Sequence, residues 1–218
     1  MNIEQARFNM IEQQIRPWNV LEQDVLSLLS LVKRENFVPP AYKNLAFVDT
    51  EIPLPNNECM LAPKVEARLL QSLAVKKHEQ VLEIGTGSGY MAALLAHKAR
   101  YVTTVEIDPE LKAMAEKNLA HNGVTNVSVA LGNGAQGWAH GMEPYDVIII
   151  SGALPILPDA FLQQLKVGGR LAAIIGTAPV MTAQLITRVS DNSFHTEKLF
   201  ETQTKVLREA STPSTFTF

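Results

Sequence analysis

Residues 81–89, Val-Leu-Glu-Ile-Gly-Thr-Gly-Ser-Gly, decide the fold of this 218-residue chain. An apolar run leads into three alternating glycines, Gly85, Gly87 and Gly89, and a helix-like segment follows at 90–98. The pattern predicts a strand, a tight turn and a helix, which together bring backbone N–H groups against a bound nucleotide-like ligand. Glycines with this spacing are also compatible with a turn that has only a structural role.

Two acidic residues stand at the offsets that such a ligand requires. Glu106 closes the next apolar strand and lies 21 positions after Gly85, about the spacing at which a carboxylate reaches ribose hydroxyls. Glu83 precedes the first glycine by two positions, where it would repel a diphosphate and attract the cationic amino acid end of S-adenosylmethionine. The dinucleotide fingerprint also requires a glycine where this chain has Tyr90. The acid-x-Gly-x-Gly-x-Gly pattern resembles the Rossmann-like methyltransferases, so S-adenosylmethionine is the expected cofactor.

The composition is that of an ordinary globular protein. Hydrophobic residues make up 46% of the chain, charged residues make up 19%, and the net charge is −3 without a basic tract, so nucleic acid is not an expected partner. A single cysteine, Cys59, excludes an internal disulfide and is typical of a reducing cytoplasm. No signal peptide and no apolar run of about 18 residues is evident, so we expect no membrane span. The dispersed histidines lack metal-ligand spacing, so no metal site is expected.

The periodicity of apolar residues divides the chain near residue 75. Residues 1–75 predict a helical N-terminal extension with an irregular acceptor-side loop, and residues 76–218 predict an α/β domain. Short apolar runs such as 147–150 indicate strands buried on both faces, and therefore a parallel sheet. The expected helices are 1–15, 21–34, 63–74, 89–98, 109–121 and 158–166, and the expected strands are 80–84, 101–106, 126–131, 146–151, 169–176, 181–190 and 194–202.

These elements predict a Rossmann-like α/β fold. The sheet is expected to be mostly parallel, with helices on both faces and the N-terminal helical extension beside it. Residues 191–193, Asp-Asn-Ser, join the last two expected strands and are typical of a hairpin turn. The sheet is therefore expected to end in an antiparallel C-terminal hairpin, as methyltransferase sheets do.

Several further motifs follow one another in a fixed order along the chain. They are Gln13-Gln14-Ile15-Arg16-Pro17-Trp18, Arg34-Glu35-Asn36-Phe37-Val38-Pro39, Ile52-Pro53-Leu54, the glycine segment up to Tyr90, Gly132-Asn133-Gly134 with Gly137-Trp138, and Gln164-Leu165-Lys166-x-Gly168-Gly169. In this order they resemble the protein-L-isoaspartate O-methyltransferases over most of the chain. The resemblance implies an S-adenosylmethionine-dependent enzyme that methylates the carboxyl group of L-isoaspartyl residues, so that damaged proteins are repaired. The expected partners are proteins or peptides that contain such residues.

The resemblance also implies roles for individual residues. Glu83 is expected to orient the glycine turn and to balance the methionine end of the cofactor, Glu106 to bind the ribose, and Asn133 to border the adenine. The substrate loop lies within 56–63. Its candidate residues are Cys59, Met60 and Leu61, and the candidate cofactor-binding residues are Glu83, Gly85, Thr86, Gly87, Ser88, Gly89, Glu106, Ile107, Asn133, Gly134 and Ser151.

The substrate loop departs from the family pattern. The family carries Gln-Thr-Ile-Ser before its proline, whereas this chain has Glu58, Cys59, Met60 and Leu61. Leucine cannot donate a hydrogen bond to an acceptor carboxylate, and Glu58 is expected to repel one. Three alternatives therefore stay open: a methyltransferase with another acceptor, a cofactor-binding protein without catalysis, and a dehydrogenase. The sequence gives no oligomeric state and does not show whether 1–75 or the C-terminal tail closes over the site.

Overall fold

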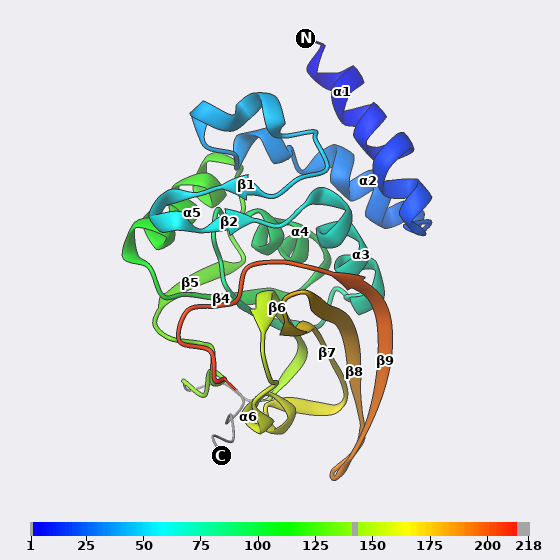
Figure 1. Cartoon of the computed structure of the whole chain (residues 1–218), viewed down its shortest axis with the longest axis vertical. Helices are drawn as coiled ribbons and strands as arrows, with labels where there is room; N and C mark the ends of the chain where they lie inside the picture. Colours follow the sequence, from blue (N-terminus) through cyan, green and yellow to red (C-terminus); the bar gives the residue numbers. More distant parts are fainter. Residues whose placement is uncertain (1, 141–143, 213–218) are drawn as a thin grey trace.

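The computed structural model describes residues 2–140 and 144–212. A seven-stranded sheet forms its centre in the order β5-β4-β3-β6-β7-β8-β9, and β1 and β2 form a separate antiparallel pair. Figure 1 shows the N-terminal segments, from blue to cyan, gathered above the strands of the large sheet. The strands are β1 (Ile52–Pro53), β2 (Cys59–Met60), β3 (Gln80–Ile84), β4 (Tyr101–Glu106), β5 (Val127–Leu131), β6 (Tyr145–Leu154), β7 (Leu165–Thr177), β8 (Val180–Ser190) and β9 (Ser193–Thr202).

The pairing of the strands confirms the predicted fold class. The four neighbouring pairs from β5 to β7 are parallel. β8 then pairs antiparallel with β7, and β9 pairs antiparallel with β8. The expected C-terminal hairpin is therefore β8–β9, and it continues an antiparallel edge that begins at β7.

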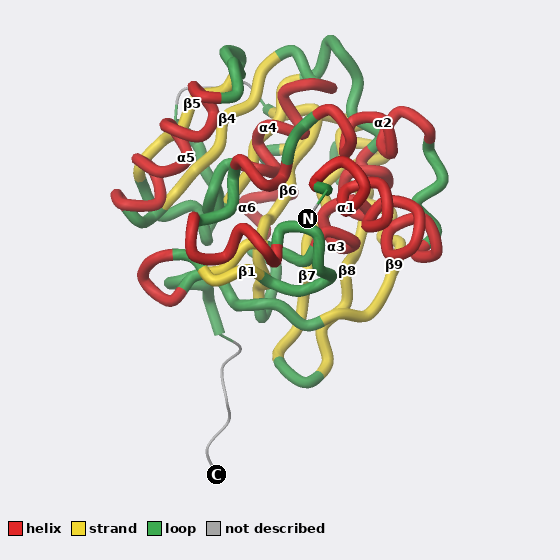
Figure 2. Tube along the Cα trace, turned by 90° about the horizontal axis from the view of Figure 1, so that it is seen from above, coloured by secondary structure: helices red, strands yellow, loops and turns green. Residues whose placement is uncertain are grey.

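Helices cover both faces of this sheet (Figure 2). The α-helices are α1 (Ile3–Asn9), α2 (Gln23–Leu31), α3 (Pro63–Leu73), α4 (Tyr90–Lys98), α5 (Pro109–His121) and α6 (Asp159–Gln163). A π-helical segment, η1 (Met10–Ile15), continues α1, and short 3-10 turns are η2 (Arg16–Trp18), η3 (Arg34–Asn36), η4 (Pro40–Leu45) and η5 (Pro55–Asn57). Across residues 2–140 and 144–212, none of these helices combines the length and apolar character needed to cross a bilayer.

Alternate residues of the central strands enter two hydrophobic clusters, one on each face of the sheet. Val81 and Val147 belong to the larger cluster, together with residues of α2, α3 and α4. Leu82 and Ile148 belong to the smaller cluster, which includes Phe161 of α6. Because these strands are buried on both faces, they have the near-continuous apolar sequence expected of a parallel sheet.

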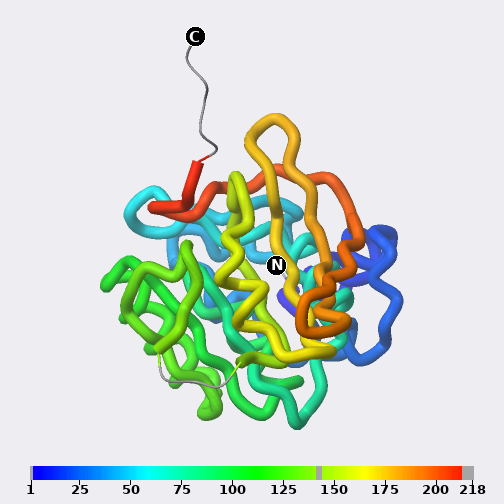
Figure 3. Tube along the Cα trace, turned by 90° about the horizontal axis from the view of Figure 1, so that it is seen from below, coloured from blue at the N-terminus to red at the C-terminus, as the bar shows by residue number. Residues whose placement is uncertain are grey.

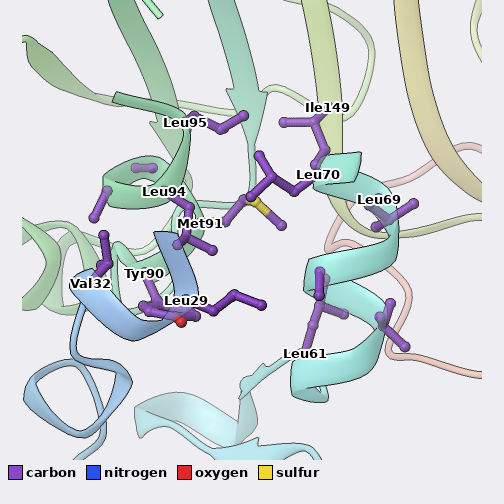
Figure 4. Packing of buried hydrophobic residues seen from close by; sticks show 14 of the residues in the cluster. Leu29, Val32, Leu61, Leu69, Leu70, Tyr90, Met91, Leu94, Leu95 and Ile149 are labelled. Atoms are coloured by element: carbon purple, nitrogen blue, oxygen red, sulfur yellow. The ribbon is translucent and has the colours of Figure 1, made fainter. Parts of the chain in front are cut away.

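The N-terminal helices share the larger cluster with the sheet. Figure 4 shows Leu29 of α2, Leu70 of α3, Tyr90 of α4 and Ile149 of β6 converging on one region, with Leu61 at the start of α3. Each of these side chains is at most 6% exposed. The division of the chain at residue 75 remains a prediction about its organisation, since one cluster draws on both parts.

The structure corrects the expected elements around β7. The sequence predicts a helix over 158–166 and a strand from 169, whereas α6 ends at Gln163 and β7 begins at Leu165. Leu165 is fully buried and pairs with Tyr145 of β6, so burial in the sheet outweighs helix continuation. Gly168 follows at φ +82°, a left-handed conformation that kinks the strand and that glycine adopts without strain.

Candidate functional site

A cavity opens at the carboxyl ends of β3, β4, β5 and β6. The chain proceeds from β3 to β4 and β5 on one side and then returns to β6 on the other side of β3, and ligands of open α/β sheets bind at such a reversal. The cavity is open to solvent on one side, and polar and apolar groups both line it. Its lining is Glu58, Cys59, Ile84, Gly85, Gly87, Val105, Glu106, Ile107, Leu111, Gly132, Asn133, Gly134, Ala135, Ser151, Leu207 and Arg208.

The glycine turn between β3 and α4 forms one wall of this cavity. Gly85, Gly87 and Gly89 have φ values of +91°, +54° and +85°, which side chains of L-residues rarely adopt. A Cβ atom on Gly85 would also lie 3.1 Å from the carbonyl oxygen of Ser151 in β6. The turn therefore requires glycine both for its conformation and for its approach to the neighbouring strand.

Glu106, at the end of β4, fixes the glycine turn. Its Oε2 accepts a hydrogen bond from the Gly87 N–H at 2.8 Å, and its Oε1 accepts one from the Asp108 N–H at 3.1 Å. Burial raises the pKa of Glu106, and the backbone donors, above all the Gly87 N–H, oppose that rise. The Gly87 N–H is thus bound by Glu106, and the expected role of Glu83 in orienting the turn stays a prediction.

Glu83 instead lies at the centre of a hydroxyl network beneath the turn. Its carboxyl group is fully buried and accepts from Ser151 Oγ at 2.7 Å and from Thr104 Oγ1 at 2.8 Å. Thr86 Oγ1 continues the network, 2.6 Å from Thr104 Oγ1. Because its partners are neutral hydroxyls, burial dominates and raises the pKa of Glu83 to about 8.

A second, smaller cavity of about 280 Å³ adjoins the first. Cys59, Gly85, Gly87 and Ser151 border both cavities. The remaining lining of the second is Leu61, Glu66, Glu83, Thr86, Ser88, Tyr90 and Met91. The Tyr90 hydroxyl is buried there without a hydrogen-bond partner among the described residues. Two buried carboxyl groups and this hydroxyl suit a small cationic group. The larger cavity combines apolar side chains such as Ile84, Val105 and Leu111 with polar groups, as sites for nucleoside-like ligands do.

The side of the larger cavity that is expected to border the adenine is formed after β5. The Asn133 Oδ1 atom accepts from the Ala135 N–H at 2.9 Å, and its Nδ2 atom donates to Glu209 Oε2 at 2.7 Å. A Cβ on Gly134 would lie 2.8 Å from Ile84 Cδ1, so glycine permits this loop to approach β3. Asn133 thus lies in the lining of the larger cavity, and its amide oxygen and amide nitrogen each make a hydrogen bond.

The structure separates the three candidate residues of the substrate loop. Cys59 borders both cavities, and Leu61 borders the smaller one while it packs in the core. Met60 is 4% exposed and belongs to the lining of neither cavity. Burial, followed by the charge of Glu51, raises the pKa of the Cys59 thiol to about 12. Cys59 therefore stays a protonated thiol and not a nucleophilic thiolate.

The buried ion pair between Arg34 and Glu66 anchors the substrate loop. Arg34 Nε lies 3.2 Å from Glu66 Oε2, and its two terminal nitrogens donate to the Ala46 and Leu61 carbonyls at 3.0 and 2.7 Å. Burial raises the pKa of Glu66 to about 7 although Arg34 acts in the opposite direction. The arginine thus ties the loop carbonyl of Leu61 to the first turn of α3.

The C-terminal segment supplies residues that the sequence did not point to. Leu207 and Arg208 line the larger cavity, and Figures 1 and 3 show the red segment after β9 running beside the cyan loop that contains β1 and β2. No motif marks these residues, so only the fold places them at the site. Arg208 Nε also lies 3.0 Å from Glu58 Oε1, so a cation stands beside this carboxylate, and the expected repulsion of an acceptor by Glu58 stays a prediction.

The fold therefore brings the predicted cofactor-binding residues together around the two cavities, and only Gly89 among them lies outside both linings. Gly85, Gly87, Glu106, Ile107, Asn133, Gly134 and Ser151 line the larger cavity, and Glu83, Thr86 and Ser88 line the smaller one. Gly89 lies in neither lining and packs against Ala115 of α5. In the described part of the chain, no group of three or more His, Cys, Asp or Glu side chains is arranged to hold a metal ion.

Comparisons with known proteins identify the family of this chain. The sequence model of the protein-L-isoaspartate(D-aspartate) O-methyltransferase family matches residues 5–207. A protein-L-isoaspartate O-methyltransferase of Koribacter versatilis is 36% identical over 193 residues, which cover 88% of this chain and 86% of that protein. One of Gloeobacter violaceus is 40% identical over 168 residues, covering 77% of this chain and 82% of that protein.

A solved structure shares the fold. It is a Plasmodium falciparum protein described as a protein-L-isoaspartate O-methyltransferase, in complex with S-adenosyl-L-homocysteine. It superposes with a TM-score of 0.81 at 19% identity and covers 96% of this chain and 99% of that chain. The family resemblance drawn from the ordered motifs is thus confirmed by the match over residues 5–207, and the chain belongs to the protein-L-isoaspartate(D-aspartate) O-methyltransferase family.

Proposed function

We propose that this chain transfers a methyl group from S-adenosylmethionine to the free carboxyl group of L-isoaspartyl residues in damaged proteins. Family membership supports the reaction class. The observation that carries the proposal is the shared lining of the two cavities, because Cys59 of the substrate loop borders the same space as Gly85 and Gly87 of the glycine turn. A donor held along the turn would therefore present its reactive centre to the loop that receives the acceptor.

The residues of the site have distinct tasks in this proposal. Glu106, whose carboxylate is fixed by two backbone donors, receives the ribose hydroxyls. Gly134 and Ile84 border the adenine. Glu83 faces the ammonium group of the methionine end, where a cation would draw the buried carboxyl into its ionised form. When bound, the cofactor supplies a methyl group on a sulfonium, which makes that methyl electrophilic.

Transfer to a carboxylate does not require a general base. A free carboxyl group has a pKa near ~4 and is ionised at neutral pH. The protein's contribution is to hold the acceptor oxygen in line with the methyl and to exclude water, which is mainly an effect of positioning. Arg34 serves that positioning, because it fixes the carbonyl of Leu61 in the substrate loop.

The test is a methylation assay on paired peptides. Purified protein is incubated with cofactor labelled in the methyl group and with an isoaspartyl peptide or the matching aspartyl peptide. The expected result is label in the isoaspartyl peptide alone, released as methanol in mild alkali because carboxyl methyl esters are labile to base. If the isoaspartyl peptide gains no label above its aspartyl control, the proposal fails.

A second candidate keeps the cofactor and changes the acceptor. It is favoured by Leu61, which occupies the position of the family's hydroxyl residue and packs in the core, so it offers no hydrogen bond to a carboxylate. This alternative predicts binding of S-adenosylhomocysteine without isoaspartyl activity. Restored activity in Leu61→Ser would identify the substituted loop as the cause, whereas label that is stable to alkali on another acceptor would support the alternative.

The proposed setting is the cytoplasm, and the proposed partners are proteins or peptides that carry isoaspartyl residues. The lone cysteine, Cys59, is free, and a chain without disulfides suits a reducing compartment. The net charge of −3 gives nucleic acid no general electrostatic attraction to the protein. Fractionation of the source cells with detection of the protein by antibody tests the compartment.

A further inference from the structure

Acidic side chains stand in and beside the larger cavity. Glu58 and Glu106 belong to its lining, and Asp108, the N-cap of α5, is joined to Glu106 and to Arg208 by hydrogen bonds. An acceptor that approaches as a carboxylate would be repelled by these groups if their charges were unopposed. A carboxyl methyltransferase with this sequence therefore needs a cation at the opening.

Arg208 supplies that cation from the C-terminal segment. Its Nε atom lies 3.0 Å from Glu58 Oε1, and one terminal nitrogen donates to Asp108 Oδ2 at 2.8 Å. The Arg208 guanidinium lowers the pKa of Asp108. Lys205 adds a weaker contact, with Nζ 3.4 Å from Glu58 Oε1, and also donates to the carbonyl of Asn57.

The backbone that leads into Arg208 is fixed independently of these ion pairs. The Ala153 N–H donates to the Lys205 carbonyl at 2.9 Å, and the Leu207 N–H donates to the Ala153 carbonyl at 2.9 Å. The Leu207 side chain fills the space above Gly152, where a Cβ would lie 2.6 Å from Leu207 Cδ2. The position of Arg208 at the opening is therefore set by β6, and its side chain reaches from there to the loop.

The ion pairs connect three segments that are distant in sequence. Asn56 Nδ2 donates to the same Asp108 oxygen at 2.9 Å, so the 56–58 loop is bound to the start of α5 both directly and through Arg208. On the other side of the cavity, Asn133 Nδ2 binds Glu209 Oε2 at 2.7 Å. The C-terminal segment thus spans the cavity between the substrate loop and the adenine side.

We propose that Arg208 is a positioning residue that neutralises Glu58 and holds residues 56–59 of the substrate loop at the opening of the larger cavity, so that a carboxylate acceptor can enter. The inference rests on the proposed function, since it concerns the acceptor of that reaction. Both sides of the guanidinium are engaged by protein carboxylates, and Arg208 acts on the acceptor through the charge of Glu58 and the position of the loop.

The test compares acceptor and cofactor binding in a charge-compensating pair of variants. In Arg208→Ala, the KM for the isoaspartyl peptide is expected to rise about tenfold or more, because Glu58 and Asp108 lose their closest cation and Glu58 keeps the weaker contact with Lys205. The Kd for S-adenosylhomocysteine, measured by calorimetry, is expected to change less than about threefold. Adding Glu58→Gln to Arg208→Ala is expected to bring the KM back to within about threefold of that of Glu58→Gln alone.

Salt and two further variants separate this role from a merely structural one. The rise in KM of Arg208→Ala is expected to shrink as salt increases, since the acceptor carboxylate approaches through solvent, where salt screens its repulsion by Glu58. Arg208→Lys is expected to keep most of the effect of the positive charge. Arg16→Ala is the matched control, because the Arg16 side chain is 39% exposed against 38% for Arg208 and pairs with Glu12 outside both cavity linings.

Each outcome has a definite meaning. If the wild-type protein does not methylate the isoaspartyl peptide, the proposed function fails and this inference fails with it. If the wild type is active and Arg208→Ala leaves its KM unchanged, only the inference fails. A loss in Arg208→Ala that Glu58→Gln does not relieve would assign Arg208 to direct binding of the acceptor and overturn the positioning role.

Discussion

Glu83 and Glu106 are both buried acids, and the nature of their partners separates their roles. Glu106 accepts two backbone N–H bonds and lines the larger cavity, whereas Glu83 is surrounded by the hydroxyls of Ser151 and Thr104. Backbone donors favour a carboxylate, and neutral hydroxyls in a buried place compensate its charge less. The two acids that look alike in the sequence therefore differ: Glu106 is a carboxylate fixed by the backbone, as the proposed ribose ligand requires, and Glu83 is a titratable group beneath the turn.

We expect Glu106→Gln to weaken cofactor binding. A glutamine side chain accepts through one oxygen and places an NH2 group against one of the two backbone donors, Gly87 or Asp108. The loss of charge-assisted bonds of about 1.5–3 kcal/mol raises the Kd for S-adenosylhomocysteine by about 10- to 100-fold. Calorimetric titration measures this Kd, and an unchanged value would show that Glu106 does not support the turn or the ribose.

Glu83 is expected to make stability depend on pH. Its folded-state pKa of about 8 lies above the reference value of 4.5, so between these values the folded protein holds a proton that the unfolded chain has lost. The free energy of unfolding therefore falls as pH rises from 4.5 to about 8, by at most ~1.4 kcal/mol per pH unit for this group. Glu66, whose pKa is raised to about 7, acts in the same direction.

Urea unfolding of the wild type and of Glu83→Gln between pH 5 and 8 checks this expectation. The variant has no proton to lose at this position, so its stability should fall less steeply over the range. Equal slopes in the two proteins would show that Glu83 is ionised in the folded state, in contradiction to its burial among hydroxyls.

At the scale of elements, the turn between β3 and α4 also sets the contact between α4 and α5. Gly89 at the start of α4 faces Ala115 of α5, and a Cβ there would lie 3.3 Å from the Ala115 Cβ and 3.4 Å from its Cα. Asp108 caps α5 through bonds to the Glu110 and Leu111 N–H groups. The third glycine of the motif is therefore required for helix packing, and its contact with the cofactor stays a prediction.

Gly89→Ala and Gly168→Ala form a matched pair that tests this packing role. Their φ values are +85° and +82°, but a Cβ on Gly168 would meet nothing within 4 Å. We expect Gly168→Ala to cost about 1–2 kcal/mol for its left-handed backbone, and Gly89→Ala to cost about 1–3 kcal/mol more for overpacking against α5. Urea unfolding measures both, and equal losses would mean that α4 and α5 adjust freely.

At the scale of the whole molecule, the N-terminal helices and the sheet form one packed body. The larger hydrophobic cluster includes Ile15 and Leu29 as well as Val147 and Ile149. Arg170 of β7 crosses the boundary near residue 75, because it donates to the Ala74 carbonyl at 2.8 Å as well as pairing with Glu79. Removal of 1–75 would therefore expose a large apolar face of the sheet.

The two tryptophans, one in each part of the chain, report whether the parts unfold together. Trp18→Phe leaves Trp138 as the fluorescent probe, and Trp138→Phe leaves Trp18. In urea, we expect each variant to show one fluorescence transition that coincides with its own loss of circular dichroism. A shared core makes unfolding cooperative, so different probes follow the same transition. In either variant, a fluorescence midpoint that differs from the circular dichroism midpoint would instead support separate domains at residues 1–75 and 76–218.

The sequence by itself determined β3, β4 and α5 to the residue, because short buried strands and an Asp-Pro helix start are local patterns. It also determined the family and most of the cofactor cavity, since the glycine turn and Glu106 lie on consecutive βα units. Only the tertiary structure showed that Glu106 binds the Gly87 N–H and that Arg208 lies against Glu58. Such contacts join distant parts of the chain, as Thr204 and Glu51 do across 153 positions. They depend on the order in which the strands pair in the sheet, and the periodicity of apolar residues does not give that order.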